Sequence, residues 1–350
     1  MEPMPTRLLP ALMLLLVAAL ALPACGRDDE PADGDATRLE PAELEQRVDR
    51  IKQRFAQAVD ERTALDEQIE ELAGLLQAQP GHAEGQALMG RMLMVHDENE
   101  QALEHFETAL DLSPGDVELH LLAGTVAMGL NDLDRAYRHY SEAVGLEPEH
   151  SFARLHLAQV QIERQEYDRA RDTLLETLRL DDAMHGAYYA LATLNARQGR
   201  LGQAIDQIQR AIERLNERDP RYKRQLVSYT RTHATLLRRA NEPQAALDAL
   251  RELPPEQQMT LAVADDLALC WQMLGRPEHA ARHYESLAMF RPDDERVPAR
   301  AARWYIKAGQ PVEARRQIEA VERINPNAAA LEELRDGLQA LEADPARGTG

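Results

Sequence analysis

Cysteine, aromatic residues and net positive charge are all scarce in this chain of 350 residues. Two cysteines allow at most one intramolecular disulfide, so no disulfide framework holds the fold together. Aromatic residues make up 4% of the chain, a composition that favours short aliphatic helices over a sheet core. Because 60 Asp and Glu outnumber 40 Lys and Arg, the average surface repels polyanions, which argues against a nucleic-acid-binding protein.

Residues 1–24 have the pattern of a secretory signal peptide. Arg7 precedes an apolar run over 8–24, which is shorter than the roughly 20 residues needed to span a bilayer as a helix. The run ends in Leu22-Pro23-Ala24-Cys25, which resembles the bacterial lipobox except for its proline. The resemblance implies cleavage before Cys25 and acylation of that cysteine. An uncleaved anchor and an ordinary secreted protein are the alternatives.

A period of 34 residues organises most of the remaining chain. Repeat units start at 83, 117, 151 and 185 and, after eight extra residues at 219–226, at 227, 261 and 295. The eighth and twentieth positions of every unit are small: Gly90, Gly124, Ala158, Ala192, Ala234, Ala268 and Ala302, then Ala102, Ala136, Ala170, Ala204, Ala246, Ala280 and Ala314. Small residues at two fixed points let two helices approach closely, and a larger side chain four positions later, such as Phe106 or Tyr140, fills the remaining space.

Each unit is predicted to be a helix–turn–helix hairpin. Turn-forming residues separate its two helices: Asp97, Asn131, Gly199, Asn241, Gly275 and Gly309. Prolines end the second helix of four units: Pro114, Pro148, Pro292 and Pro326. This spacing resembles the tetratricopeptide repeat, although the tryptophan usual early in that repeat is missing. The resemblance implies an all-α fold, a right-handed α-solenoid of antiparallel helix hairpins.

These patterns divide the chain into segments of different character. We expect a removed signal peptide at 1–24, an acidic flexible linker at 25–40, and N-terminal helices or a degenerate repeat at 41–82. A capping helix is expected at 329–343 and a disordered tail at 344–350. Between them lie seven repeats, at 83–116, 117–150, 151–184, 185–218, 227–260, 261–294 and 295–328.

Sequence motifs for the common catalytic mechanisms are missing. The chain has no nucleophile elbow, phosphate-binding loop, dinucleotide-binding glycine motif or H-E-x-x-H zinc motif. His279 and His283 lie four residues apart on one predicted helix, but two ligands do not make a metal site. We therefore predict no enzyme activity, no metal and no cofactor. An enzyme with an unrecognised site is the least favoured alternative.

The concave side of a solenoid is lined by the first helix of every unit. In tetratricopeptide proteins, fixed positions of that helix commonly face a partner, and in the first four units they carry mostly apolar residues: Met94, Leu121, Met128, Phe152, Leu155, Ile162 and Tyr189. In the fifth and seventh units these positions are basic: Arg231, Arg238, Arg239, Arg296, Arg300, Arg303 and Lys307. An extended partner with an apolar part and an acidic part would fit such a groove. Ion pairing with neighbouring repeats is the alternative for the arginines.

The sequence thus indicates a non-catalytic, lipid-anchored adaptor that binds protein partners on the periplasmic side of a bacterial envelope membrane, with the outer membrane favoured over the inner one. Resemblance to envelope lipoproteins leaves pilus or secretion assembly, peptidoglycan enzymes and polysaccharide export open as the process served. An anionic small ligand or glycan is the alternative to a protein partner, and its binding should weaken with added salt.

Overall fold

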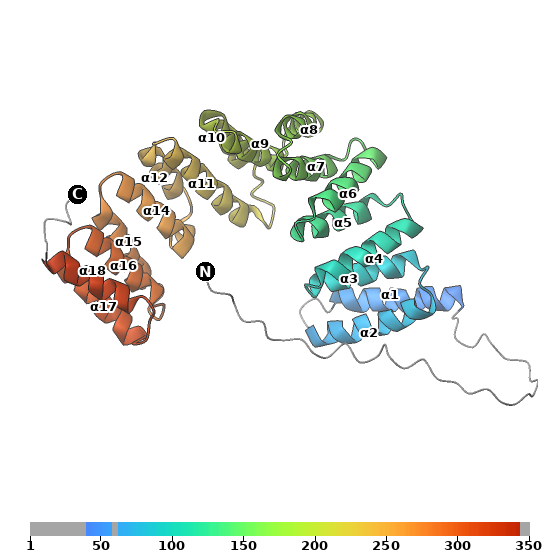
Figure 1. The fold of residues 1–350 in the computed structure, drawn as a ribbon, viewed down its shortest axis with the longest axis horizontal. Helices are drawn as coiled ribbons and strands as arrows, with labels where there is room; N and C mark the ends of the chain where they lie inside the picture. The colour runs from blue at the N-terminus through green and yellow to red at the C-terminus, as the bar shows by residue number, and fades with distance from the viewer. Residues whose placement is uncertain (1–39, 58–61, 344–350) are drawn as a thin grey trace, which may run out of the picture.

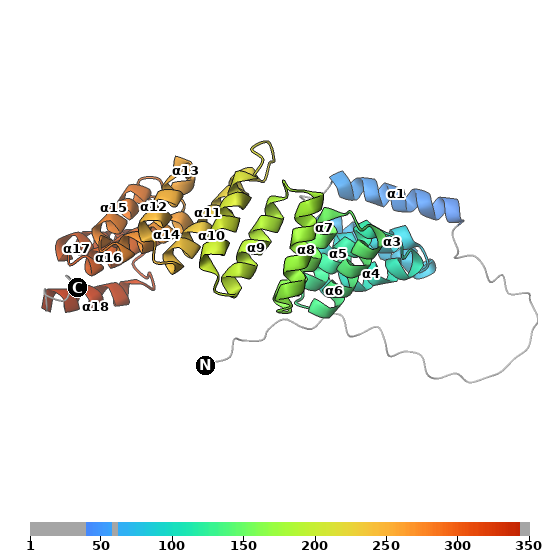
Figure 2. The ribbon, with the colours of Figure 1, turned by 90° about the horizontal axis from the view of Figure 1, so that it is seen from above.

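The computed structural model describes residues 40–57 and 62–343, and these residues form eighteen α-helices and no β-strand. Figure 1 shows antiparallel helix pairs following one another along an open arc, so the predicted all-helical repeat solenoid is confirmed. In Figure 2 the same arc is seen from above, with the pairs in chain order. The predicted signal peptide, Cys25 and the tail at 344–350 lie outside the described residues.

The first helix of each repeat faces the inner side of the arc and the second lies outside it (Figure 1). The first helices are α3 (Ala83–Val95), α5 (Val117–Gly129), α7 (Ser151–Glu163), α9 (His185–Arg197), α11 (Tyr222–Arg239), α14 (Leu261–Met273) and α16 (Arg296–Lys307). The second helices are α4 (Asn99–Leu112), α6 (Leu133–Leu146), α8 (Tyr167–Leu180), α10 (Leu201–Glu213), α12 (Pro243–Arg251), α15 (Pro277–Ala288) and α17 (Pro311–Ile324).

Glycine at the eighth position of a unit lets a large aromatic ring sit against the first helix. A Cβ atom placed on Gly124 would lie 2.7 Å from Cε1 of Tyr140, and one placed on Gly90 would lie 2.6 Å from the ring of Phe106. Both rings are fully buried between the two helices of their hairpins. The structure therefore explains why the small residue and the larger one recur together.

The turn between the two helices always contains one residue with a left-handed backbone. Its φ is positive in all seven units, at Asp97, Asn131, Gln165, Gly199, Asn241, Gly275 and Gly309. Gly, Asn and Asp adopt this conformation most readily, which is why six of the seven were recognisable in the sequence. Gln165 carries no such signal, and only the 34-residue period identifies its role.

Helices outside the repeats cover both ends of the array, two at the N-terminal end and one at the C-terminal end. At the N-terminal end, α1 (Pro41–Gln57) and α2 (Arg62–Ala78) pack with α3 in one core. At the C-terminal end, α18 (Leu331–Ala343) packs against α16 and α17. It buries four leucines spaced for one helix face: Leu331, Leu334, Leu338 and Leu341.

The fifth repeat departs from the common hairpin. Its first helix, α11, has 18 residues and its second, α12, has only 9. The consecutive prolines Pro254 and Pro255 follow α12 and lead into the one-turn helix α13 (Pro255–Gln258). Since proline lacks an N–H donor and disfavours a helical residue before it, α12 cannot extend to the usual length.

Candidate functional site

The apolar residues predicted for the groove differ in exposure. Met94, Leu121 and Met128 are half-buried and pack against the core of the first units. Phe152 exposes 57% of its surface. Two others, Leu155 and Ile162, are only 6% and 3% exposed and belong to the core between the third and fourth units. The prediction that these two side chains line an open groove is therefore wrong.

Close packing of α9 on α7 causes this burial. A Cβ atom placed on Gly186, in the first turn of α9, would lie 2.9 Å from Cδ2 of Leu155. At the other end of α9, Arg197 donates a hydrogen bond from Nη1 to the carbonyl oxygen of Ile162 at 3.4 Å. Because glycine has no side chain, α9 covers a surface that α7 would otherwise expose.

Two adjacent aspartates of α14 neutralise three of the predicted groove arginines. Asp266 accepts hydrogen bonds from Nε of Arg231 at 2.6 Å and from Nη1 of Arg238 at 3.2 Å. Asp265 accepts one from Nε of Arg300 at 2.7 Å. These pairs join α14 to both neighbouring first helices, so they hold the inner side of the solenoid together.

The remaining basic residues of the seventh unit are also engaged. Arg303 pairs with Glu333 of α18 at 2.7 Å, and Arg296 pairs with the aspartate two residues before it, also at 2.7 Å. Lys307 lies over the ring of Trp304, 4.3 Å from its centroid. Ion pairing within the chain, the alternative left open by the sequence, thus applies to most of this cluster.

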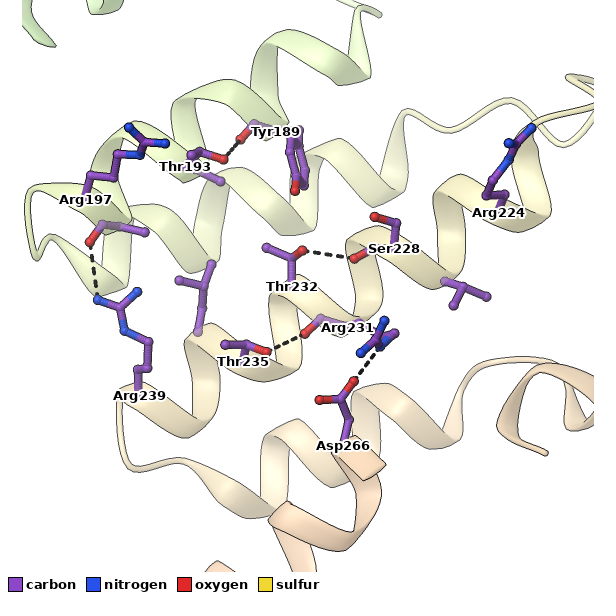
Figure 3. Close-up of a pocket in the computed structure, with 14 residues that line it drawn as sticks. Tyr189, Thr193, Arg197, Arg224, Ser228, Arg231, Thr232, Thr235, Arg239 and Asp266 are labelled. Atoms are coloured by element: carbon purple, nitrogen blue, oxygen red, sulfur yellow. Dashed lines mark hydrogen bonds and ion pairs between the residues drawn. The ribbon is translucent and has the colours of Figure 1, made fainter. Parts of the chain in front are cut away.

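A pocket between α9 and α11 retains positive charge that the described residues do not neutralise. It has a volume of about 880 Å³, and Asp266 of α14 lies at one side of it (Figure 3). Of the predicted groove residues it brings together Tyr189, Arg231 and Arg239. Its full lining is Tyr189, Ala192, Thr193, Ala196, Arg197, Arg224, Val227, Ser228, Arg231, Thr232, Thr235, Leu236, Arg239 and Asp266.

Four guanidinium groups face this pocket against one carboxylate. Arg239 donates only to the carbonyl oxygen of Ala196, at 3.4 Å, and Arg224 has no partner among residues 40–57 and 62–343. Arg197 pairs with Glu163 and Arg231 with Asp266. Arg224 and Arg239 are therefore the two cations most available to a ligand.

The three threonine hydroxyl groups in the pocket already donate hydrogen bonds within their own helices. Thr193, Thr232 and Thr235 each donate to the carbonyl oxygen four residues earlier, at 3.1, 3.0 and 2.9 Å. Figure 3 shows these bonds along α9 and α11. The donors left for a ligand are the guanidinium groups, which suit carboxylate, phosphate or sulfate oxygens, and the hydroxyl groups of Ser228 and Tyr189.

Tyr189 forms an aromatic wall beside these cations, and its ring stacks on that of Tyr229, which does not line the pocket. The rings of Tyr189 and Tyr229 stack with centroids 4.6 Å apart, and Oη of Tyr229 lies 2.9 Å from Nδ1 of His185. Burial raises the pKa of Tyr229 to about 12, while burial and the nearby Arg221 lower the pKa of His185. Both groups are neutral at pH 7, so this wall offers apolar contact without opposing the positive charge.

The two histidines of α15 make different contacts within the chain. Nδ1 of His279 lies 2.8 Å from a carboxylate oxygen of Glu278, whereas His283 is packed against Trp271 with ring centroids 5.5 Å apart. Within the part of the chain that the structure describes, no three His, Cys, Asp or Glu side chains could hold a metal ion. In the same part, no helix is long and apolar enough to cross a membrane.

Family models of the tetratricopeptide repeat match the chain at 88–151, 127–183 and 157–220. A search of curated proteins finds no match to the sequence. Among solved structures, PilW, a widely conserved type IV pilus biogenesis factor, is similar with 16% identity and a TM-score of 0.53. The similarity covers 65% of this chain and 100% of PilW.

Two further solved structures are similar at lower TM-scores. PilF of Pseudomonas aeruginosa has 16% identity and a TM-score of 0.48 over 65% of this chain and 99% of its own. YrrB, a tetratricopeptide protein with an unusual peptide-binding site, has 16% identity and a TM-score of 0.41 over 56% of this chain and 97% of its own. Together with the hairpins and their spacing, the family matches over 88–220 show that this chain contains tetratricopeptide repeats arranged in an α-solenoid.

Proposed function

We propose that this protein is a non-catalytic scaffold that binds an acidic segment of a partner protein in the pocket between α9 and α11. The observation that carries the proposal is the excess of four arginines over one carboxylate in a pocket of about 880 Å³, with Arg224 and Arg239 unpaired by any carboxylate in the described chain. A cationic site of this size fits several side chains of an extended peptide.

Carboxylates on the partner are the groups that would bind most strongly to these arginines. Hydrogen bonds to charged groups contribute about 1.5–3 kcal/mol each, and arginine presents its donors as a fork that matches a carboxylate. The stacked Tyr189 and the small side chains of Ala192 and Ala196 offer apolar surface next to the cations. An acidic peptide with interspersed apolar residues therefore suits the site better than a uniformly charged one.

We further propose that Cys25 is acylated and that the scaffold works at the periplasmic face of a bacterial outer membrane. Support comes from the lipobox-like residues that precede Cys25 in the sequence. The pilus biogenesis factor PilW shares the helical architecture, and pilus or secretion assembly is one process that the proposal admits. Peptidoglycan enzymes and polysaccharide export remain within it.

Peptide binding tests the pocket. The probe is a fluorescein-labelled hexapeptide, Leu-Asp-Glu-Leu-Asp-Glu with a free carboxyl terminus, whose fluorescence polarisation reports binding. Changing Arg224→Glu together with Arg239→Glu should weaken binding about ten-fold or more, because two attractive charges become repulsive. The matched control changes Arg200→Glu and Arg210→Glu, two exposed arginines that have no partner in the described chain and do not line the pocket.

Equal weakening in both variants would show that only net charge matters and would refute the pocket as the site. A sulfated disaccharide that displaces the peptide from the unchanged protein would instead favour an anionic glycan as ligand.

Acylation is tested separately. Cys25→Ala should release the protein from the membrane fraction and remove the mass of the acyl chains. A variant that stays membrane-bound would contradict the lipid anchor.

A further inference from the structure

A second cleft lies on the outer side of the arc, where the fifth repeat departs from the pattern. It has a volume of about 770 Å³ and is bounded by α10 and α12, the second helices of the fourth and fifth repeats, with α11 between them. Figure 1 shows α10 and α12 on the outer side and α11 on the inner side. The cleft is thus separate from the arginine pocket, which opens between α9 and α11.

The lengths of the two helices of this repeat explain the cleft. Second helices elsewhere in the array have 12 to 14 residues, whereas α12 has 9. First helices elsewhere have 12 or 13 residues, whereas α11 has 18 and starts within the extra segment at 219–226. As a result, Tyr222 and Leu226 on the first turns of α11 line the cleft.

The cleft has an apolar interior and an acidic rim. Its interior is formed by aliphatic side chains of α10, of α11 and of the segment after α12: Ile205, Ile212, Leu226, Leu237 and Leu253. Its rim carries three exposed carboxylates, Glu213, Asp248 and Glu252, and none of the described residues that line it is a lysine or arginine.

These carboxylates are available to a partner. Glu213 and Glu252 form no ion pair within the described chain, and Asp248 accepts only a hydrogen bond from Gln244 at 2.9 Å. Exposed acids of one sign around an apolar depression attract a cationic group and leave its apolar neighbours free to enter.

One polar group inside the cleft is also without a partner. Thr230 lines the cleft and is only 5% exposed, yet its hydroxyl makes no hydrogen bond to any described residue. Other threonines of α11, such as Thr232 and Thr235, satisfy their hydroxyl groups within the helix. The oxygen of Thr230 is not among the fully buried unpartnered atoms of the described chain, so it is open to the cleft and can bond to water or to a polar group of a ligand.

We infer that this outer cleft docks a segment of a second partner protein in which basic residues alternate with leucine-like ones. The apolar side chains enter between α10 and α12, the basic side chains meet the rim carboxylates, and a backbone group of the segment meets the Thr230 hydroxyl. Because α11 contributes to both sites, the fifth repeat brings together an acidic segment on the inner side and a basic segment on the outer side.

The test uses a labelled hexapeptide, Leu-Lys-Leu-Leu-Lys-Leu, acetylated and amidated, with fluorescence polarisation as readout. Changing Glu213→Lys together with Glu252→Lys should weaken its binding about ten-fold. The matched control changes Asp172→Lys and Asp206→Lys, exposed acids of α8 and α10 that do not line the cleft and give the same change of net charge. The control should change affinity less than about two-fold.

A second arm tests the apolar interior with Gly-Lys-Gly-Gly-Lys-Gly, which should bind at least about ten-fold more weakly than the leucine peptide. Equal weakening by the two charge-reversal pairs would overturn the inference, because the peptide would then be following the general acidity of the chain. The absence of binding at about 1 mM leucine peptide would overturn it as well. Far-UV circular dichroism establishes that each variant is folded.

Discussion

The packing of Tyr140 against Gly124 can be tested with a substitution that is ordinarily stabilising. Replacing glycine by alanine inside a helix stabilises by about 0.5–1 kcal/mol, since alanine loses less backbone entropy on folding. At Gly124 the added methyl group would lie 2.7, 2.8 and 2.9 Å from Cε1, Cζ and Cδ1 of Tyr140. Normal carbon–carbon contacts are about 3.5–4.0 Å, so the ring or the helix must move.

The ring has little room to move. Tyr140 is 2% exposed, its Oη lies 3.1 Å from Oγ1 of Thr125, and its ring stacks on His156 with centroids 5.2 Å apart. Overpacking of this kind costs about 1–3 kcal/mol, which exceeds the gain in helix propensity. We therefore expect Gly124→Ala to lower the free energy of unfolding by about 1–2 kcal/mol.

Gly145 provides the matched control in the same hairpin. It lies in α6, and nothing lies within 4 Å of a Cβ atom built there, so Gly145→Ala should stabilise by about 0.5 kcal/mol. Urea unfolding followed by circular dichroism measures both variants. If Gly124→Ala is as stable as the unchanged protein while Gly145→Ala behaves as expected, the assignment of a packing role to the small residue of each repeat is refuted.

Three other substitutions probe a turn, a buried histidine and the pocket. Gln165→Gly should raise the free energy of unfolding by about 0.5–1 kcal/mol because φ is 63° at this residue, and an unchanged urea midpoint would contradict that cost. Burial lowers the pKa of His139, so below pH 6.5 the unfolded chain binds a proton at this residue more readily than the folded chain does. The free energy of unfolding should therefore fall on acidification. His139→Gln should reduce this fall between pH 8 and pH 5.5 by up to about 1.4 kcal/mol. An equal loss in both proteins would exclude this histidine as a source. Asp266→Asn leaves Arg231 and Arg238 without their carboxylate, so it should lower the free energy of unfolding by about 3 kcal/mol. The same change should tighten binding of the acidic hexapeptide several-fold, because Asp266 no longer competes with the peptide for these arginines. Weaker binding by a folded variant would contradict this competition.

The hairpins were predictable because each one is determined locally. The small residue at position eight, the larger residue at position twenty-four and the turn residue between the helices lie within one unit, and the period repeats this pattern. Gln165 was missed because its side chain gives no turn signal, so only its place in the period indicates the left-handed backbone.

The site was less predictable because contacts between units determine it. Leu155 is buried by Gly186, which belongs to the next unit, and Arg231 finds its carboxylate 35 residues away on α14. A sequence places each side chain on a helix face but does not say which neighbour covers or neutralises it. Arg197 and Arg224 therefore emerge as pocket residues only from the fold, although both lie in a segment, 197–239, that is rich in arginine.

Hydrogen exchange with mass spectrometry tests the central proposal most directly, because it locates a bound peptide without altering the pocket. With the acidic hexapeptide near saturation, backbone amides of α9 and α11 should exchange more slowly, while those of α4, α6 and α15 should be unchanged. Protection confined to α9 and α11 would place the acidic segment in the arginine pocket. Protection elsewhere, or none at saturation, would contradict the account.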